Sequence, residues 1–489
     1  MQTHELKKKT VSAMMWTALK KYTTMSISFI TGIILARLLT PHDYGTIGML
    51  SIFMSVANTF IDAGFGSALI QKKRPTQTDY STIFFWNLGM SVILYVILFY
   101  SAPYIARFYN LPILCDVLRV QAIILIINAF NIIQRNQLTK KLEFKIQSKV
   151  SIYSSIISLT VTIIMAYKGF GVWSLVTQNI LLAGIPAIIF WFYLKWRPAF
   201  VFSWKSFRQL FNFGFYMLMS KLVNSIGNNL EGLLIGRFFN SSTLGYYSKA
   251  RSTEILASYC ISDVVHAVTY PVYAEVQDNK KLLSDIIKRL TMSVAFITFP
   301  ILFLLILIAK PIFLVIYSER WLPSVFYFQV LCLVGIIRCM YPISHHSILA
   351  IGKSKLKFWW TLIGQCLTML LLFIGIVTKG IIGLIIGLVV ANIINYFINI
   401  VLVSKYIGYK WTEHIKNLSP ITIVSVLAFL AGYFSTYFTQ LNLFIEAGIE
   451  TAVFLTFIAG WIYFFKPKSF YLVMDIVPEK FKFWKKRTV

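Results

Sequence analysis

Several ionisable residues lie within long apolar stretches of this 489-residue chain. A charge at bilayer depth costs roughly 2.5–3.5 kcal/mol to insert, and such groups usually face a bundle interior or a wet cavity. Lys and Arg form charge-assisted hydrogen bonds with phosphate oxygens, so a cationic set here predicts a cavity for an anionic substrate such as a diphosphate. The members of this set are Lys20, Lys21, Lys221, Arg119, Arg251 and Arg338.

A second set suits ion coupling or gating, because intramembrane carboxylates can exchange protons or bind cations and arginines at segment ends can act as caps or gates. Its members are Asp62, Glu231, Glu254, Arg37 and Arg237. Simpler explanations remain open. Lys20 and Lys21 reach the interface by snorkelling if the first helix begins later than expected. Asp62, in the sequence FIDAGFG, could pair with a neighbouring basic residue or cap a helix break near Gly64 and Gly66.

The composition is that of a membrane protein. Hydrophobic residues make up 57% of the chain and charged residues 13%, whereas a soluble domain has about 25% charged residues. About fourteen apolar segments reach the roughly 20 residues that a spanning helix needs. Two of them are separated only by a very short turn around Lys379 and Gly380. The sequence therefore predicts an all-α integral membrane protein with about 14 transmembrane helices.

Positive charge alternates along the chain between successive gaps. With the N-terminus in the cytoplasm, 32 of the 46 Lys and Arg residues, Arg135 among them, fall in gaps on that side or in the C-terminal tail. This bias is the positive-inside rule, and it predicts a multi-pass membrane protein with both termini cytoplasmic. The net charge of +28 is then explained by topology and contact with membrane lipids, and nucleic acid is not expected as a partner.

An internal repeat is visible when the chain is shifted by 200 residues. GIILARLLTPHDYG, residues 32–45, lies over GLLIGRFFNSSTLG, residues 232–245, so that Arg37 aligns with Arg237 and both glycine pairs coincide. A further match between the two copies pairs Lys168 and Gly169 with Lys379 and Gly380. Six spans separate the copies, so the copies run in the same direction, as in transporters built from two rocking bundles. The expected organisation is a six-helix lobe at 1–204, a second at 205–416, and two additional helices with a basic tail at 417–489.

Other polar residues suggest packing rather than chemistry. Asn128, Asn131 and Gln134 form an amide stripe on one face of a helix, which is more typical of interhelical hydrogen bonding than of a sugar site. The five cysteines show no metal-ligand spacing, and the adjacent His345 and His346 point about 100° apart on a helix. No phosphate-binding loop is present. We expect no metal, no cofactor, no catalytic residue and no ATP hydrolysis in this chain.

Several motifs together resemble a known family. LARLLTPHDYGTIGMLSIF, FIDAGFGSALIQKK, SAPYIARFYN, LTKKLEFK, GFGVWSLV, FSWKSFRQLFNFGF and LGYYSKARS are similar to the Wzx-type polysaccharide and O-antigen flippases. These flippases form the polysaccharide transporter family of the multidrug/oligosaccharidyl-lipid/polysaccharide superfamily. The resemblance covers at least the first 270 residues. The family has no strict catalytic signature that could be transferred to particular residues here.

The resemblance implies a fold like that of multidrug and toxin extrusion transporters, with two lobes facing a central cavity. It implies a transporter rather than an enzyme. Such a transporter would flip undecaprenyl-diphosphate-linked oligosaccharide across the bacterial inner membrane by alternating access, for lipopolysaccharide, O-antigen or other surface polysaccharide biosynthesis. Either a gradient of H+ or Na+ or removal of the cargo by later enzymes would supply direction, and polysaccharide polymerase machinery would be a partner. Two alternatives remain open: an ion-coupled multidrug antiporter of the same superfamily, and a membrane-embedded polymerase or glycosyltransferase.

Overall fold

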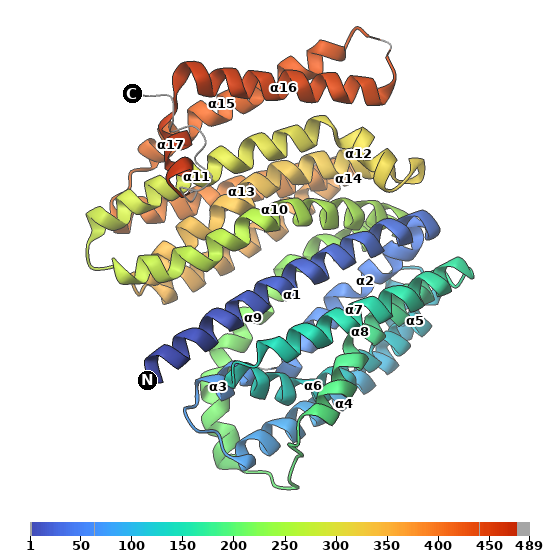
Figure 1. Ribbon diagram of the computed structural model, residues 1–489. Coiled ribbons are helices and arrows are strands. Elements are labelled where there is room, and N and C mark those ends of the chain that lie inside the picture. The colour runs from blue at the N-terminus through green and yellow to red at the C-terminus, as the bar shows by residue number, and fades with distance from the viewer. Residues whose placement is uncertain (1, 63, 440, 477–489) are drawn as a thin grey trace. The chain divides into compact units, whose positions relative to one another are not determined.

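The protein is all-helical in the residues that the computed structural model describes, which are 2–62, 64–439 and 441–476 (Figure 1). The chain forms two compact units, residues 1–248 and residues 249–489. Ten of the described helices are long and apolar enough to cross a membrane. The all-α prediction is therefore confirmed. The count of fourteen spans stays a prediction, since α1, α9 and α10, which carry several charged side chains, are not among the ten.

The first unit contains nine helices and the start of a tenth. In chain order they are α1 (Gln2–Leu38), α2 (Pro41–Asp62), α3 (Phe65–Gln71), α4 (Gln77–Phe108), α5 (Ile113–Gln121), α6 (Ile123–Lys140), α7 (Phe144–Tyr167), α8 (Val172–Tyr193), α9 (Trp204–Phe238) and the first turns of α10 (Ser241–Glu275). Helix α1 packs along α7, α2 packs along α9, and α6 packs between α4 and α8 (Figure 1).

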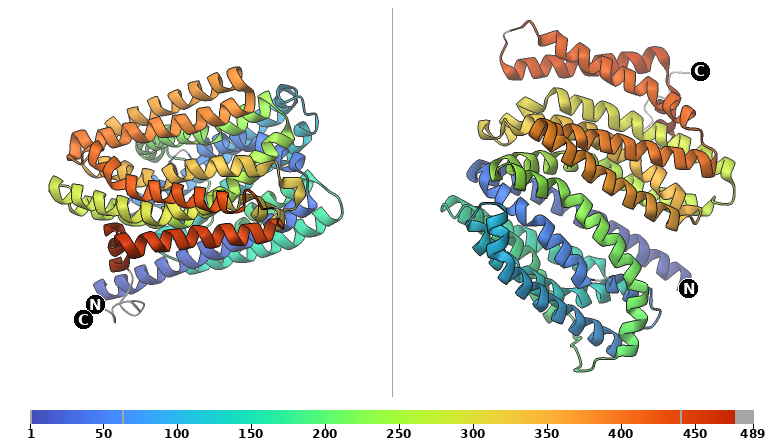
Figure 2. Two further views of the ribbon diagram at one scale, coloured as in Figure 1. Left: turned by 90° about the horizontal axis from the view of Figure 1, so that it is seen from above. Right: turned by 180° about the vertical axis from the view of Figure 1, so that it is seen from behind.

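The second unit contains the remainder of α10 and the helices that follow it. These are α11 (Lys280–Leu307), α12 (Ala309–Ile316), the 3₁₀ turn η1 (Glu319–Trp321), α13 (Ser324–Ala350), α14 (Ser354–Ile407), α15 (Trp411–Thr436), α16 (Leu443–Phe465) and α17 (Lys468–Ile476). Helix α13 packs between α11 and α14, and α15 packs on α11 and on α16. The α15 and α16 helices run side by side in both views of Figure 2.

The helix α14 contains the predicted short turn. Its backbone leaves the helical region at Lys379 and at Gly380, where φ is +60° and glycine avoids steric strain. The two arms fold back on each other so closely that a Cβ atom on Gly375 would lie 2.1 Å from the carbonyl oxygen of Gly383. The repeat-related turn at Gly169 also has a positive φ of +82°. The two predicted segments on either side of Lys379 are thus separate helical arms.

The start of α2 and the start of α10 are capped at repeat-related positions. Before α2, the hydroxyl oxygen of Thr40 accepts from the backbone N–H of Asp43 at 3.3 Å, and Oδ2 of Asp43 accepts from the backbone N–H of Thr40 at 2.9 Å. Before α10, the backbone N–H of Thr243 donates to Oδ1 of Asn240 at 2.7 Å. Thr and Asn are favoured caps because their side-chain oxygens satisfy the free N–H groups of the first helical turn. The 200-residue spacing thus places equivalent caps as well as equivalent glycines.

These two helix starts cross at the aligned glycines. A Cβ atom on Gly45 would lie 1.7 Å from the carbonyl oxygen of Ser241, and one on Gly245 would lie 1.8 Å from that of Pro41. Each glycine therefore touches the backbone of the other copy of the repeat. No other residue type fits at either position without displacing a helix.

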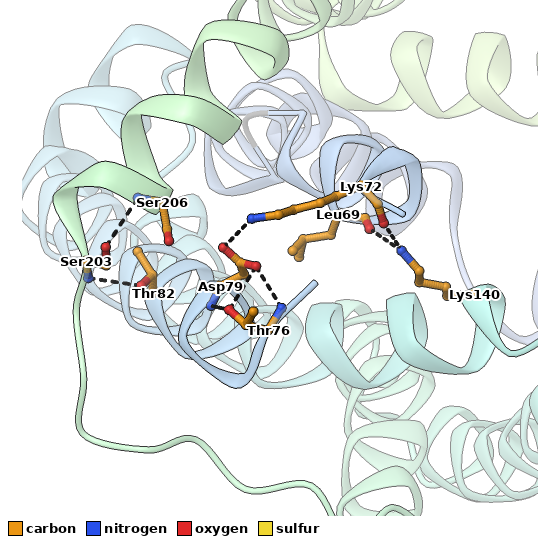
Figure 3. Close-up of polar contacts among 8 residues, drawn as sticks. All are labelled: Leu69, Lys72, Thr76, Asp79, Thr82, Lys140, Ser203 and Ser206. Atoms are coloured by element: carbon orange, nitrogen blue, oxygen red, sulfur yellow. Dashed lines mark hydrogen bonds and ion pairs between the residues drawn. The ribbon is translucent and has the colours of Figure 1, made fainter. Parts of the chain in front are cut away.

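A polar network joins α3, α4, α6 and α9 at one end of the first unit (Figure 3). Thr76 and Asp79 form a capping box at the start of α4, and Asp79 also pairs with Lys72 at 2.8 Å. Lys140, at the end of α6, donates to the carbonyl oxygens of Leu69 at 3.0 Å and of Lys72 (Figure 3). Carbonyls at a helix end lack intrahelical partners, so this ammonium group satisfies the end of α3. Ser203 ties the start of α9 to Thr82 at 3.1 Å.

Candidate functional site

A polar cavity of about 460 Å³ lies within the first unit, among α2, α5, α6, α7 and α8. Its polar lining consists of amides, hydroxyls and one guanidinium group, with no carboxylate among the described lining residues. The polar residues are Asn58, Gln121, Asn128, Asn131, Arg135, Ser151, Ser154, Ser155 and Asn179. A polar cavity of this size among apolar helices has the dimensions of a small-molecule site.

Helix α6 supplies the central part of the lining. Asn128, Asn131 and Arg135 are spaced by three and four residues, so they lie on one face of the helix. The Nδ2 of Asn128 donates to Oδ1 of Asn58 on α2 at 3.0 Å, and Asn58 in turn donates to the Met54 carbonyl at 2.8 Å. The predicted amide stripe therefore includes an interhelical hydrogen bond, but it also faces a cavity.

Two amide oxygens in the lining have no hydrogen-bond partner among the described residues. They are Oε1 of Gln121, on a residue 6% exposed, and Oδ1 of Asn131, on a residue 3% exposed. Leaving a buried acceptor unsatisfied costs about 1–3 kcal/mol, so such groups normally bind water or a ligand. Both oxygens require a hydrogen-bond donor.

Helix α7 adds hydroxyl groups to the same cavity. The hydroxyls of Ser154 and Ser155 donate to the carbonyls of Val150 and Ser151 at 2.6 and 2.9 Å, so their oxygens remain able to accept. The sequence signal for this face is a run of small polar residues at helical spacing from Ser151 through Ser158. That run was not among the predicted site residues, and neither were Gln121 or Asn179.

Arg135 gives the cavity a positive charge. Its side chain is exposed and forms no ion pair or side-chain hydrogen bond with the described part of the chain. Lys20, on α1, lies close enough for the two like charges to interact. Lys20, a member of the predicted cationic set, therefore lies near the cavity. In the sequence, Arg135 directly follows an apolar segment, so it was counted among the basic residues that determine the membrane topology.

The other predicted residues of the first unit make separate contacts. Lys221 forms an ion pair with Asp62 through Nζ and Oδ2. The guanidinium of Arg119 lies 4.4 Å from the centre of the Phe99 ring, and its Nε donates to the Phe99 carbonyl at 3.4 Å. Lys21 is exposed on α1.

The gate candidates of the first unit also have partners. Arg237 donates to the Phe108 carbonyl at 2.5 Å and lies 4.7 Å from the centre of the same residue's ring. The Tyr247 hydroxyl donates to the Glu231 carboxylate. Arg37 is exposed at the end of α1.

In the second unit, the predicted residues Glu254 and Arg338 form a buried ion pair. The NH1 of Arg338 lies 2.5 Å from Oε2 of Glu254, whose side chain is 0% exposed. Arg251 is half-buried on the same helix as Glu254. Lys249, on the same helix, is buried with its Nζ 4.3 Å from the centre of the Tyr317 ring and 5.7 Å from that of Trp321. Such positions stabilise an ammonium group through cation–π attraction.

Comparison with solved structures defines the class of fold. The chain is similar to the structure described as the lipid II flippase MurJ in an inward closed conformation, with a TM-score of 0.74, 16% identity, and coverage of 93% of this chain and 100% of the other. It is also similar to an inward-facing multidrug resistance MATE family transporter, with a TM-score of 0.61, 16% identity, and coverage of 81% and 98%. The protein is a multi-pass membrane protein with this helical fold.

Sequence comparison identifies the family. The model for "polysaccharide biosynthesis protein" matches residues 34–326, so the chain belongs to that family. The teichuronic acid biosynthesis protein TuaB of Bacillus subtilis is 28% identical over 427 residues, which cover 87% of this chain and 88% of the relative. The lipopolysaccharide biosynthesis protein WzxC of Escherichia coli is 22% identical over 420 residues, which cover 84% and 85%.

Proposed function

We propose that this protein flips a lipid-linked oligosaccharide across the membrane for surface polysaccharide biosynthesis. The observation that carries the proposal is the family match over residues 34–326, together with relatives named for teichuronic acid and lipopolysaccharide biosynthesis. A further relative, of Rhizobium meliloti, is named as a succinoglycan biosynthesis transport protein, and it is 23% identical over 408 residues. The function is transport, not catalysis.

The cargo is a polyprenyl diphosphate oligosaccharide, with undecaprenol as the lipid. Movement by alternating access requires a cavity that accepts the polar part of the cargo while its lipid stays in the bilayer. The charge distribution supports this chemistry, because Lys and Arg outnumber Asp and Glu among the ionisable residues predicted to lie within the spans, and cations bind diphosphate oxygens. The same excess disfavours the alternative, an antiporter for cationic drugs.

The topology that goes with this function is about fourteen spans in the bacterial inner membrane, with both termini cytoplasmic. Its support is the distribution of Lys and Arg between alternate gaps. The proposal includes two six-helix lobes, at 1–204 and 205–416, and additional helices at 417–489. It also includes coupling of transport to H+ or Na+. Association with polymerase machinery would place the flipped cargo beside the reaction that consumes it.

The experiment that tests the function is reconstitution of the full chain in vesicles that contain a fluorescent lipid-diphosphate oligosaccharide. A membrane-impermeant quencher reports how fast the cargo moves between leaflets. We expect faster movement than in protein-free vesicles, without ATP. Folded protein that gives no acceleration would rule out flipping, and uptake of a cationic dye driven by an ion gradient would favour the antiporter.

The predicted cationic residues can be tested in the same assay. Lys21→Gln and Lys221→Gln, singly and together, are expected to slow transport because each removes a charge from the diphosphate site. Lys205→Gln, at the exposed start of α9, is the matched control and should transport normally. Normal transport by the double variant would remove Lys21 and Lys221 from the site.

A further inference from the structure

The cavity among α2, α5, α6, α7 and α8 combines two features that topology and helix packing leave unexplained. It has buried amide oxygens without donors, and it has an exposed guanidinium group without a described acidic partner. We propose that this cavity binds a glycosyl unit that carries a negative charge. The inference rests on the proposed function, since it assigns one part of an oligosaccharide cargo to one place in the chain.

The hydrogen-bonding groups of the cavity fit hydroxyl-rich ligands. The carbonyl oxygens of Gln121 and Asn131 can only accept, and the oxygens of Ser154 and Ser155 can accept as well. A sugar ring presents several hydroxyl donors in a fixed arrangement, whereas a lipid chain presents none. Binding a sugar would therefore satisfy groups that are costly to leave buried and unpaired.

The charge of the cavity selects an anion over a cation. Arg135 belongs to the lining, Lys20 lies near Arg135, and no carboxylate is among the described lining residues. A guanidinium group binds carboxylate or phosphate through two parallel hydrogen bonds. A sodium ion or a cationic drug would instead meet net repulsion. The anion could be the carboxylate of an acidic sugar or the phosphate of a glycosyl phosphate, and both present the same chemistry to Arg135.

The size of the cavity limits what it can hold. A volume of about 460 Å³ lies within the range of small-molecule sites, roughly 300–1,000 Å³. It is suited to a short glycosyl segment and not to a whole polyprenyl-linked oligosaccharide. The cavity would thus contact one charged part of the cargo.

The test is equilibrium binding to the purified full chain in nanodiscs, measured by calorimetry with four probes: glucose, glucuronate, glucose 1-phosphate and inorganic phosphate. We expect at least one anionic sugar to bind at least tenfold more tightly than glucose and inorganic phosphate. Preference for glucuronate would identify an acidic sugar as the source of the charge, and preference for glucose 1-phosphate would identify a glycosyl phosphate. Equal binding of all four probes, or no binding, would overturn the inference.

Paired variants locate the binding site. Asn131→Leu and Arg135→Gln should each weaken binding of the preferred sugar at least tenfold. Their controls are Gln134→Leu, which removes a buried amide from the same helix outside the cavity lining, and Lys141→Gln, which removes an exposed charge just after that helix. Controls that weaken binding as much as the test variants would refute the assignment. If Asn131→Leu fails to fold, Ser155→Ala tests the part of the lining that α7 supplies.

Binding and transport can fail separately. Selective sugar binding in a chain that moves no lipid-linked cargo would contradict the flippase function and leave the cavity assignment intact. Normal transport together with unselective sugar binding would support the flippase function and contradict the cavity assignment. Sugar binding and lipid transport are measured on the same purified protein, so a difference between the two results is not caused by a difference in folding.

Discussion

Lys221 on α9 pairs with Asp62, the last residue of α2, although 159 residues separate them in the chain. The pair lies beside the helix break, because Gly64 has a φ of +74° and α3 begins at Phe65. A Cβ atom on Gly64 would lie 2.6 Å from the carbonyl oxygen of Gly214, also on α9. The FIDAGFG motif thus ends one helix, starts the next and holds both against α9.

Disrupting this ion pair should have a small but coupled effect on stability. The two side chains are 41% and 30% exposed, and exposed pairs contribute about 0.2–1 kcal/mol. Asp62→Asn and Lys221→Gln should each lower the melting temperature slightly, and the double variant should lose less than the sum. Thermal unfolding of purified protein, followed by tryptophan fluorescence, measures this cycle. Strictly additive losses would show that the pair contributes nothing.

Breaking the Glu254–Arg338 pair should lower the free energy of unfolding far more than breaking the Asp62–Lys221 pair. Arg338→Gln leaves the fully buried Glu254 carboxylate without its partner, which costs about 3–5 kcal/mol. Adding Glu254→Gln removes the stranded charge, so the double variant should recover much of the stability. Lys310→Gln, at an exposed site in α12, serves as the control. A double variant less stable than Arg338→Gln would contradict this account.

Filling the glycine crossing should destabilise the first unit. Gly45→Ala and Gly245→Ala each force a methyl group into a backbone carbonyl, and overpacking of this kind costs about 1–3 kcal/mol. Because both substitutions separate the same two helix starts, the second should cost less than the first. Gly89→Ala, where a Cβ atom would meet nothing within 4 Å, is the control and should not destabilise. Unchanged melting temperatures in both single variants would argue against the crossing.

The proposed topology can be tested by cysteine labelling in intact cells. In a chain whose five cysteines are replaced, Lys168→Cys, between α7 and α8, should react with an impermeant maleimide from outside. Lys73→Cys, between α3 and α4, should react only after the membrane is permeabilised. Both positions are exposed, so access to the reagent depends on the side of the membrane. If Lys73→Cys reacted in intact cells and Lys168→Cys only after permeabilisation, the protein would have the opposite orientation in the membrane.

Local features of the fold were predictable because the responsible residues are close in sequence. Apolar length predicted the helices, and Lys379 with Gly380 predicted the turn in α14. The glycines of FIDAGFG offered a helix break near Gly64 as one of two explanations for Asp62, and the structure has that break. Each of these features depends on backbone preferences within a few residues, which a single sequence displays directly.

The candidate site was only partly predictable, because it depends on which helices become neighbours. Asn131 was recognised as part of a polar stripe, but its cavity is completed by Gln121 and by serines on α7. Arg135 was counted with the basic residues that determine the membrane topology, since nothing in the sequence distinguishes a basic residue at a span end from one in a cavity. Periodicity shows which side chains share a face, but it does not show what the face meets.

The reciprocal contact between Gly45 and Gly245 also restricts how the two copies of the repeat can evolve. At most aligned positions the copies have diverged, but here each copy supplies the backbone that excludes a side chain from the other. A one-residue insertion between Pro41 and Gly45 would break the spacing by which Pro41 contacts Gly245 while Gly45 contacts Ser241, and would place Tyr44 in the crossing. The two helix starts can therefore change in sequence, but each must keep the four-residue spacing from its contacting carbonyl to its glycine.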